Sequence, residues 1–319
     1  MKRAVCVITL SVLCLYLWLF LCAPLSEAAI AEYLKENISP TLVISQFNNQ
    51  LPLGQPVDVY IDSQGNLYVV DLSSKAVFIF DNNYQPVSRL DSVNGLHGPT
   101  AVAVDQKGNI YVSDVEGGIL VFNSIGKVIR KIDLGKMTKG KVQYANDLII
   151  DEADQLYLAT GTEQGVLVLD SQGKFKAAIT PHESVKEGPP MPVAVTQVTL
   201  DSSGRIYLLS EAMGKVYVYE NPDTFLFQFG QKGGSFGKLS RPSGIAVDRT
   251  KKLIYVTDYM RHALSIYNLD GVFLQEYGGQ GEKIGWFSHP NQIFLDKEQR
   301  LIVADSFNHR LQVLTILSR

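Results

Sequence analysis

The chain is poor in thiols, and its main part has none. Its 319 residues include three cysteines, Cys6, Cys14 and Cys22, all near the N-terminus. A domain built from the rest therefore has no disulfide, no thiolate metal site and no nucleophilic cysteine. The remaining chain, about 290 residues long, is large enough to bury a stable core without a covalent link.

A strong excess of one charge is also lacking. The chain has 29 Lys and Arg against 32 Asp and Glu, a formal net charge of −3. Removing Lys2, Arg3 and Glu27 with the first 28 residues leaves 27 against 31, or −4. Because nucleic-acid binding needs a strongly basic face, nucleic acid is not an expected partner.

Only one long apolar run is present, at the N-terminus. Residues 4–23 are uncharged, follow Lys2-Arg3 and precede Ser26-Glu27-Ala28. This order predicts a signal peptide over residues 1–28, cut after Ala28, followed by a short segment over residues 29–41. Because about 20 apolar residues can also span a bilayer, an uncleaved membrane anchor is the alternative. Both versions predict an extracytoplasmic protein, periplasmic or secreted.

A unit of about 45 residues is repeated six times. The Asp that ends its first apolar run recurs at spacings of 43, 46, 50, 47 and 48 residues: Asp62, Asp105, Asp151, Asp201, Asp248 and Asp296. In the first unit the apolar runs are Val57–Ile61, Asn66–Val70, Val77–Phe80 and Pro86–Leu90. Runs this short and rich in Val, Ile, Tyr and Phe are typical of strands. The period predicts a β-propeller with four-stranded blades.

The second predicted strand carries a tyrosine in five of the six units: Tyr68, Tyr111, Tyr157, Tyr207 and Tyr255. We expect this column to pack between neighbouring blades, with each hydroxyl finding one partner.

The two ends of the chain predict how the ring closes. The last unit supplies three strands, 292–295, 301–304 and 311–316, and an unmatched strand, 42–47, precedes the first unit. Placing the unmatched strand in the last blade pairs both free edges. The sequence therefore predicts an all-β, six-bladed propeller over residues 42–319, closed by its N-terminal strand.

Residues 300–314, RLIVADSFNHRLQVL, resemble the NHL repeat, and so do residues 244–248 and 255–258. The resemblance extends from about residue 42 to the C-terminus and implies a six-bladed NHL propeller. It is eroded in the third and fourth units, where Thr160 and Ser210 replace the second Asp. His262 and His309 occupy the histidine position of the repeat, so a structural role is expected for them.

The opening residues of the innermost strands predict a polar rim around the central channel: Asp58, Asn146, Asp147, Gln197, Asn291 and Gln292. Such an oxygen-rich ring suits a polar ligand or Ca²⁺, which Asp58, Asn146 and Asp147 would hold. The pair Asn146-Asp147 is similar to part of the cation site of gluconolactonase-like propellers, although no matching Glu is found. A water-filled channel with a polar lining is the simpler interpretation.

Zinc chemistry has less support in the sequence. NHL-type amidating lyases place histidines at the start of several first strands, and only His289 lies near such a position here.

Long connections between blades predict a second kind of site, on one face of the ring. They cover residues 135–145, 180–195, 230–241 and 278–289. Their cationic and aromatic residues predict a partner-binding surface: Lys136, Lys139, Lys141, Tyr144, Arg241 and Trp286. We expect half or more of the aromatic area of Phe236, Trp286 and Phe287 to pack inward.

Two functions from different classes follow. The first is an exported, non-enzymatic scaffold that binds a protein or a cell-envelope ligand through the long-loop face and needs no cofactor. The second is a metal-dependent lyase or lactonase-like enzyme at the mouth of the channel.

Overall fold

The computed structural model describes residues 38–316. The predicted signal peptide or anchor lies outside these residues. Within the described range, no helix is both long and apolar enough to cross a membrane.

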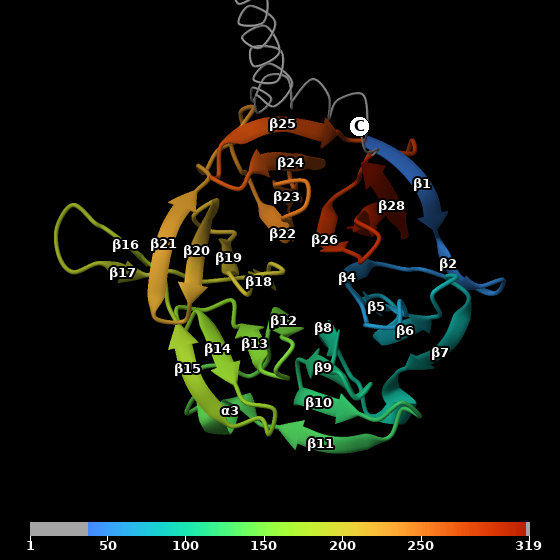
Figure 1. Cartoon of the computed structure of the whole chain (residues 1–319). Coiled ribbons are helices and arrows are strands. Elements are labelled where there is room, and N and C mark those ends of the chain that lie inside the picture. The colour runs from blue at the N-terminus through green and yellow to red at the C-terminus, as the bar shows by residue number, and fades with distance from the viewer. Residues whose placement is uncertain (1–37, 317–319) are drawn as a thin grey trace, which may run out of the picture.

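Six antiparallel four-stranded sheets form a ring in the described part of the chain (Figure 1). Blade 1 comprises β4 (Pro56–Ile61), β5 (Leu67–Asp71), β6 (Ala76–Phe80) and β7 (Pro86–Leu90). Blade 2 comprises β8 (Pro99–Val104), β9 (Ile110–Asp114), β10 (Gly118–Phe122) and β11 (Val128–Ile132). Blade 3 comprises β12 (Asp147–Ile150), β13 (Leu156–Ala159), β14 (Val166–Leu169) and β15 (Phe175–Ile179).

The second half of the ring repeats this order, with the first strand of each blade innermost. Blade 4 comprises β18 (Gln197–Leu200), β19 (Ile206–Ser210), β20 (Lys215–Asn221) and β21 (Thr224–Phe229). Blade 5 comprises β22 (Pro242–Asp248), β23 (Leu253–Asp258), β24 (Ala263–Asn268) and β25 (Phe273–Gly278). Blade 6 comprises β26 (Pro290–Leu295), β27 (Arg300–Asp305), β28 (Arg310–Ile316) and β1 (Ile38–Ile44). The predicted fold class is confirmed.

The ring closes where β1 pairs with β28, as predicted. The pairing is antiparallel and runs from Ile38 opposite Ile316 to Ile44 opposite Leu311. The strand begins four residues earlier than the sequence indicated, so the predicted boundary at residue 42 is wrong. Its predicted end at Phe47 is also wrong, because the chain turns after Ile44 into β2 (Gln46–Asn48), which pairs with β3 (Leu51–Pro52). The buried ring of Phe47 then stacks on Phe78 of blade 1, 4.9 Å between centroids.

The apolar core lies between neighbouring blades. Buried side chains form six clusters in the described part of the chain, and one of them joins Ala101 and Ile119 of blade 2 to Leu148 and Leu156 of blade 3. The tyrosine column belongs to these clusters. In blades 1 to 4 its hydroxyls donate to the Asp that ends the first strand of the same blade, as predicted, for example at 3.1 Å from Tyr68 to Asp62. In blade 5 the prediction is wrong, because the buried Tyr255 hydroxyl has no hydrogen-bond partner among the described residues.

In blades 1, 2, 5 and 6 the second Asp of the repeat ties the blade to the linker that precedes it. In blade 1 the buried Asp71 accepts the amides of Gly54 (2.7 Å) and Gln55 (3.0 Å) with one oxygen, and that of Ser74 (2.8 Å) with the other. Asp114 and Asp258 each accept two linker amides in blades 2 and 5, and Asp305 accepts the linker amide of Ser288 in blade 6. These bonds hold the long connections against the blades.

Blades 3 and 4 have Thr160 and Ser210 at this position. The linker between these blades forms the hairpin of β16 (His182–Glu183) and β17 (Met191–Pro192), which projects away from the ring (Figure 1). A hydroxyl cannot accept several amides as a carboxylate does, so this linker lacks the carboxylate clamp of the other blades.

The repeat histidines have a backbone role, as predicted. His262 and His309, both at φ 55°, lie in the turn between the second and third strands, in the left-handed region. Blade 1 has Lys75 there at φ 49°, and the other three blades have glycine: Gly118, Gly165 and Gly214. The turn therefore sets the left-handed conformation, and several residue types adopt it.

Removing β1 should destabilise the ring. A chain begun at Ser45 loses the buried side chains of Ile38 and Ile44 and exposes the edge of β28. We expect its melting temperature to be about 10 °C or more below that of a chain begun at Ile38. Thermal unfolding of both chains, followed by circular dichroism, measures the difference. Identical melting temperatures would show that β1 does not close the ring.

Candidate channel-mouth site

A cavity of about 310 Å³ opens at the mouth of the central channel. Every blade contributes the opening residues of its innermost strand or the residue just before it: Val57, Asp58, Thr100, Asn146, Thr196, Gln197, Pro242, Ser243 and Asn291. Gln55 and Arg241 come from the linkers, and Leu72, Glu211 and Tyr259 from turns between second and third strands. The cavity therefore opens on the long-loop face.

The structure brings four of the predicted rim residues into this lining: Asp58, Asn146, Gln197 and Asn291. The other two, Asp147 and Gln292, are buried. Gln292 is hydrogen-bonded both to Asp147 and to Gln197. Whether any of them binds a ligand stays a prediction. Sequence reasoning missed Glu211 and Tyr259 because their turns come from different repeats; the only available signal was that these turns share the face of the long linkers.

A polar network spans the axis of the ring. The amide nitrogen of Gln292 donates to Asp147 (3.2 Å) and to Gln197 (2.6 Å). Because Gln292 belongs to blade 6 and Asp147 to blade 3, the first bond crosses the ring between opposite blades. Gly244 makes room for it: a Cβ there would lie 2.7 Å from the side-chain oxygen of Gln292.

The two carboxyls of this network also connect neighbouring blades. Asp58 accepts the amide of Val102 at 2.7 Å, and Asp147 accepts that of Val198 at 2.8 Å. Burial, and then the charge of Asp147, raises the pKa of Asp58 well above its ordinary value. Burial raises the pKa of Asp147 to about 7. The pair therefore retains protons close to neutral pH.

This arrangement fits the predicted cation poorly. Each oxygen of Asp147 accepts a hydrogen bond from the protein, and one oxygen of Asp58 is occupied in the same way. A Ca²⁺ ion needs six to eight oxygen ligands, which Asp and Glu carboxylates, carbonyl groups and water supply. In residues 38–316, no three His, Cys, Asp or Glu side chains come together as a metal-binding group.

One cation–carboxylate pair stands at the entrance of the cavity. The Arg241 guanidinium lies 3.0 Å from Glu211 and 4.7 Å from the centre of the Tyr259 ring. Arg241 was predicted as a partner-binding residue, and the structure places it beside the channel mouth. Its charge is already balanced by Glu211.

The other predicted partner residues are spread around the ring and do not form one patch. Lys136, Lys139, Lys141 and Tyr144 are exposed on the linker from blade 2 to blade 3, in and after α3 (Leu134–Met137). Trp286 lies on the linker from blade 5 to blade 6, on the opposite side of the ring. More than half of the aromatic area of these three residues packs inward, as predicted: Phe287 is fully buried, while Phe236 is 70% and Trp286 46% exposed.

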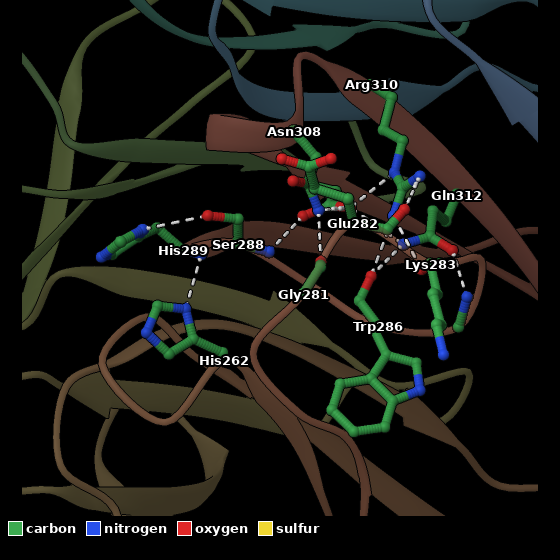
Figure 2. Close-up of polar contacts among 12 residues, drawn as sticks. His262, Gly281, Glu282, Lys283, Trp286, Ser288, His289, Asn308, Arg310 and Gln312 are labelled. Carbon is green, nitrogen blue, oxygen red and sulfur yellow. Dashed lines mark hydrogen bonds and ion pairs between the residues drawn. The ribbon is translucent and has the colours of Figure 1, made fainter.

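The linker that carries Trp286 is held by a clamp from blade 6 (Figure 2). The Arg310 guanidinium pairs with Asp305 at 2.7 Å and donates to the carbonyls of Glu282, Lys283 and Trp286 at 2.8, 3.0 and 3.0 Å. Asn308 donates to a fourth linker carbonyl, that of Gly281, and Gln312 also donates to the carbonyl of Trp286. In blade 6 the Asn and Arg of the repeat motif Asn-His-Arg therefore fix the backbone of this linker.

His289 lies next to this clamp, at the start of blade 6. Its backbone amide donates to Nδ1 of His262 at 3.0 Å, and the two rings lie 4.4 Å apart (Figure 2). Burial, and then the charge of His289, lowers the pKa of His262. Both rings thus belong to the packing of a linker.

Comparisons with known proteins agree with the fold. A family described as a 6-bladed beta-propeller matches residues 191–278, and one described as strictosidine synthase-like, N-terminal, matches residues 87–122. No curated protein matches the chain significantly.

Solved structures are similar over most of the chain. An auxiliary nutrient binding protein from Bacteroides thetaiotaomicron is 15% identical with a TM-score of 0.65, covering 88% of this chain and 76% of its own. One from Bacteroides ovatus is 14% identical with a TM-score of 0.65, covering 88% and 77%. Virginiamycin B lyase from Staphylococcus aureus is 10% identical with a TM-score of 0.57, covering 88% and 100%. At these identities the likeness establishes a shared fold.

Breaking the Arg310 clamp should cost stability. Arg310→Ala leaves the buried Asp305 carboxylate without its cation, so we expect a loss of about 3 kcal/mol in the free energy of unfolding. The control is Arg89→Ala, which removes a half-exposed surface pair with Asp91 and should change stability by at most about 0.5 kcal/mol. Urea denaturation measures both, and equal losses would contradict the clamp.

Stability should rise as the pH falls from about 8 to about 6.5. The pKa values of Asp58 and Asp147 are raised on folding, so the folded state binds more protons than the unfolded state in this range. Asp58→Asn removes one of the two buried carboxyls that titrate and should make the slope shallower, while the exposed Asp223→Asn should leave it unchanged. Thermal unfolding across this pH range measures the slopes. A slope unaffected by Asp58→Asn would contradict the coupling of the two carboxyls.

Proposed function

We propose that this chain is an exported, non-enzymatic binding protein of the NHL-repeat type. Its long-loop face binds a protein or cell-envelope ligand, and the channel-mouth cavity lies at the centre of that face. The observation that carries the proposal is the convergence of polar side chains from all six blades on one cavity. The arrangement suits binding, because polar groups in a concave site fix the orientation of a ligand.

Export is part of the proposal and rests on the N-terminal residues 1–28. The absence of thiols from residues 29–319 agrees with it, since an exported domain of this size needs no free cysteine. Two structural neighbours, both auxiliary nutrient binding proteins, are compatible with a binding role.

The chemistry of the cavity also favours binding over catalysis. The Arg241 guanidinium is paired with Glu211, the Asp58 carboxyl accepts a backbone amide, and Thr100 donates its hydroxyl proton to the carbonyl of Ala145 at 2.8 Å. Groups engaged in this way hold the site in shape. The lyase or lactonase alternative requires a cation, for which the donor set of Asp58, Asn146 and Asp147 is a poor fit.

A capture experiment with matched charge reversals tests the face. Lys136, Lys139 and Lys141 are changed to Glu on the long-loop face; in the control, Lys107, Lys127 and Lys174 are changed to Glu in turns of the opposite face. We expect the first variant to retain less of the partner from its own cell-envelope fraction, because reversed charges repel an acidic surface. The control should capture as much as the parent.

Both variants should keep the parental melting temperature, since all six side chains lie in linkers or turns. Equal capture by parent and long-loop variant, or equal loss in both variants, would contradict the proposed face.

A further inference from the structure

The charges that line the channel-mouth cavity are all accounted for within the protein. Arg241 is neutralised by Glu211, and Asp58 is buried against the amide of Val102. Among residues 38–316, no other Lys, Arg, Asp, Glu or His lines the cavity. An ionic ligand would therefore find no free counter-charge and would have to break the pair at the entrance.

Three side-chain amides remain available. Gln55, Asn146 and Asn291 line the cavity, and within residues 38–316 their side chains have no hydrogen-bond partner. Each amide offers two N–H donors and one carbonyl acceptor. They come from blades 1, 3 and 6 or their linkers, so they approach the cavity from separate directions.

The hydroxyls of the lining provide acceptors. Thr100, Thr196 and Ser243 donate their protons to the carbonyls of Ala145 (2.8 Å), Leu209 (3.2 Å) and Pro290 (2.8 Å). Their lone pairs remain for a ligand. The cavity thus presents donors and acceptors together, without net charge. A hydroxyl group both donates and accepts, and so matches such a lining, whereas a cation needs acceptors alone and an anion needs donors alone.

The remaining wall is apolar. Val57, Leu72 and Pro242 line the cavity beside the amides, and Leu72 is 42% exposed. A sugar ring has C–H groups that such a wall can cover. The volume of about 310 Å³ is at the lower end of the range for small-molecule sites, about 300 to 1,000 Å³, and so suits a molecule of one or two rings.

We propose that the channel-mouth cavity binds a neutral polyhydroxylated molecule of the size of a single sugar ring. The inference rests on the proposed binding function and names the class of ligand for the same site. The amides of Asn146 and Asn291 hold the hydroxyl groups, and the apolar wall covers one face of the ring.

A series of ligands that share one ring but differ in charge tests this directly. The purified chain is titrated calorimetrically with neutral pentoses, hexoses and N-acetylhexosamines, and then with the uronic acid and the amino sugar of whichever ring binds. We expect a neutral sugar to bind and both charged forms to bind at least about tenfold more weakly.

Paired variants locate the binding. Asn146→Ala and Asn291→Ala should each lower the affinity for the neutral sugar about tenfold, because each removes hydrogen bonds to the ligand. Asn82→Ala, an exposed amide in a turn of the opposite face, should have no effect. Melting temperatures equal to that of the parent show that each variant is folded.

Three outcomes would overturn the inference. The first is that no neutral sugar binds, and the second is that a charged form binds more tightly than the neutral sugar. Binding that ignores both Asn146→Ala and Asn291→Ala would place the sugar elsewhere. If a charged form binds more tightly and Asn291→Ala abolishes that binding, the proposed binding function still stands. The capture experiment tests that function independently.

Discussion

The antiparallel pairing of β1 with β28 is the constraint on which the rest of the structure depends. Five blades are each built from one continuous stretch of chain, and only blade 6 takes a strand from the other end. Without that strand the sheet of blade 6 would end in the unpaired edge of β28. With it, the six innermost strands are held in a closed circle. The polar residues at their starts then face a common axis.

Small and polar residues at one position of the innermost strands decide what that axis contains. Asp147, Gln197 and Gln292 fill it with hydrogen bonds, while Gly244 leaves the space that the side chain of Gln292 needs. Gln197 belongs both to this network and to the cavity lining, so the network reaches the cavity. This accounts for a site with many hydrogen-bonding groups and little net charge.

Much of the fold could be predicted from the sequence because it depends on local patterns. The repeat period, the short apolar runs and the Asp that closes each first hairpin all lie within one blade. The end of β1 could not be predicted, because Phe47 packs on Phe78 of another blade. Glu211 and Tyr259 were missed for the same reason, because they come from different repeats. The bond between Gln292 and Asp147 could not be predicted either, because it joins residues 145 apart in the chain. Lys136, Lys139 and Lys141 lie far from Trp286 around the ring. That separation depends on the order of the blades, which the pattern of charges along the sequence does not show.

The central claim is that this protein binds its ligand at the channel mouth on the long-loop face. Mapping the backbone amide chemical shifts perturbed by a saturating neutral sugar tests it most directly. The account predicts perturbed amides at Asp58, Asn146 and Asn291, where the innermost strands begin. Perturbation confined to Ile61–Ser63 and Leu295–Lys297, which line a cavity at the other end of those strands, would contradict it.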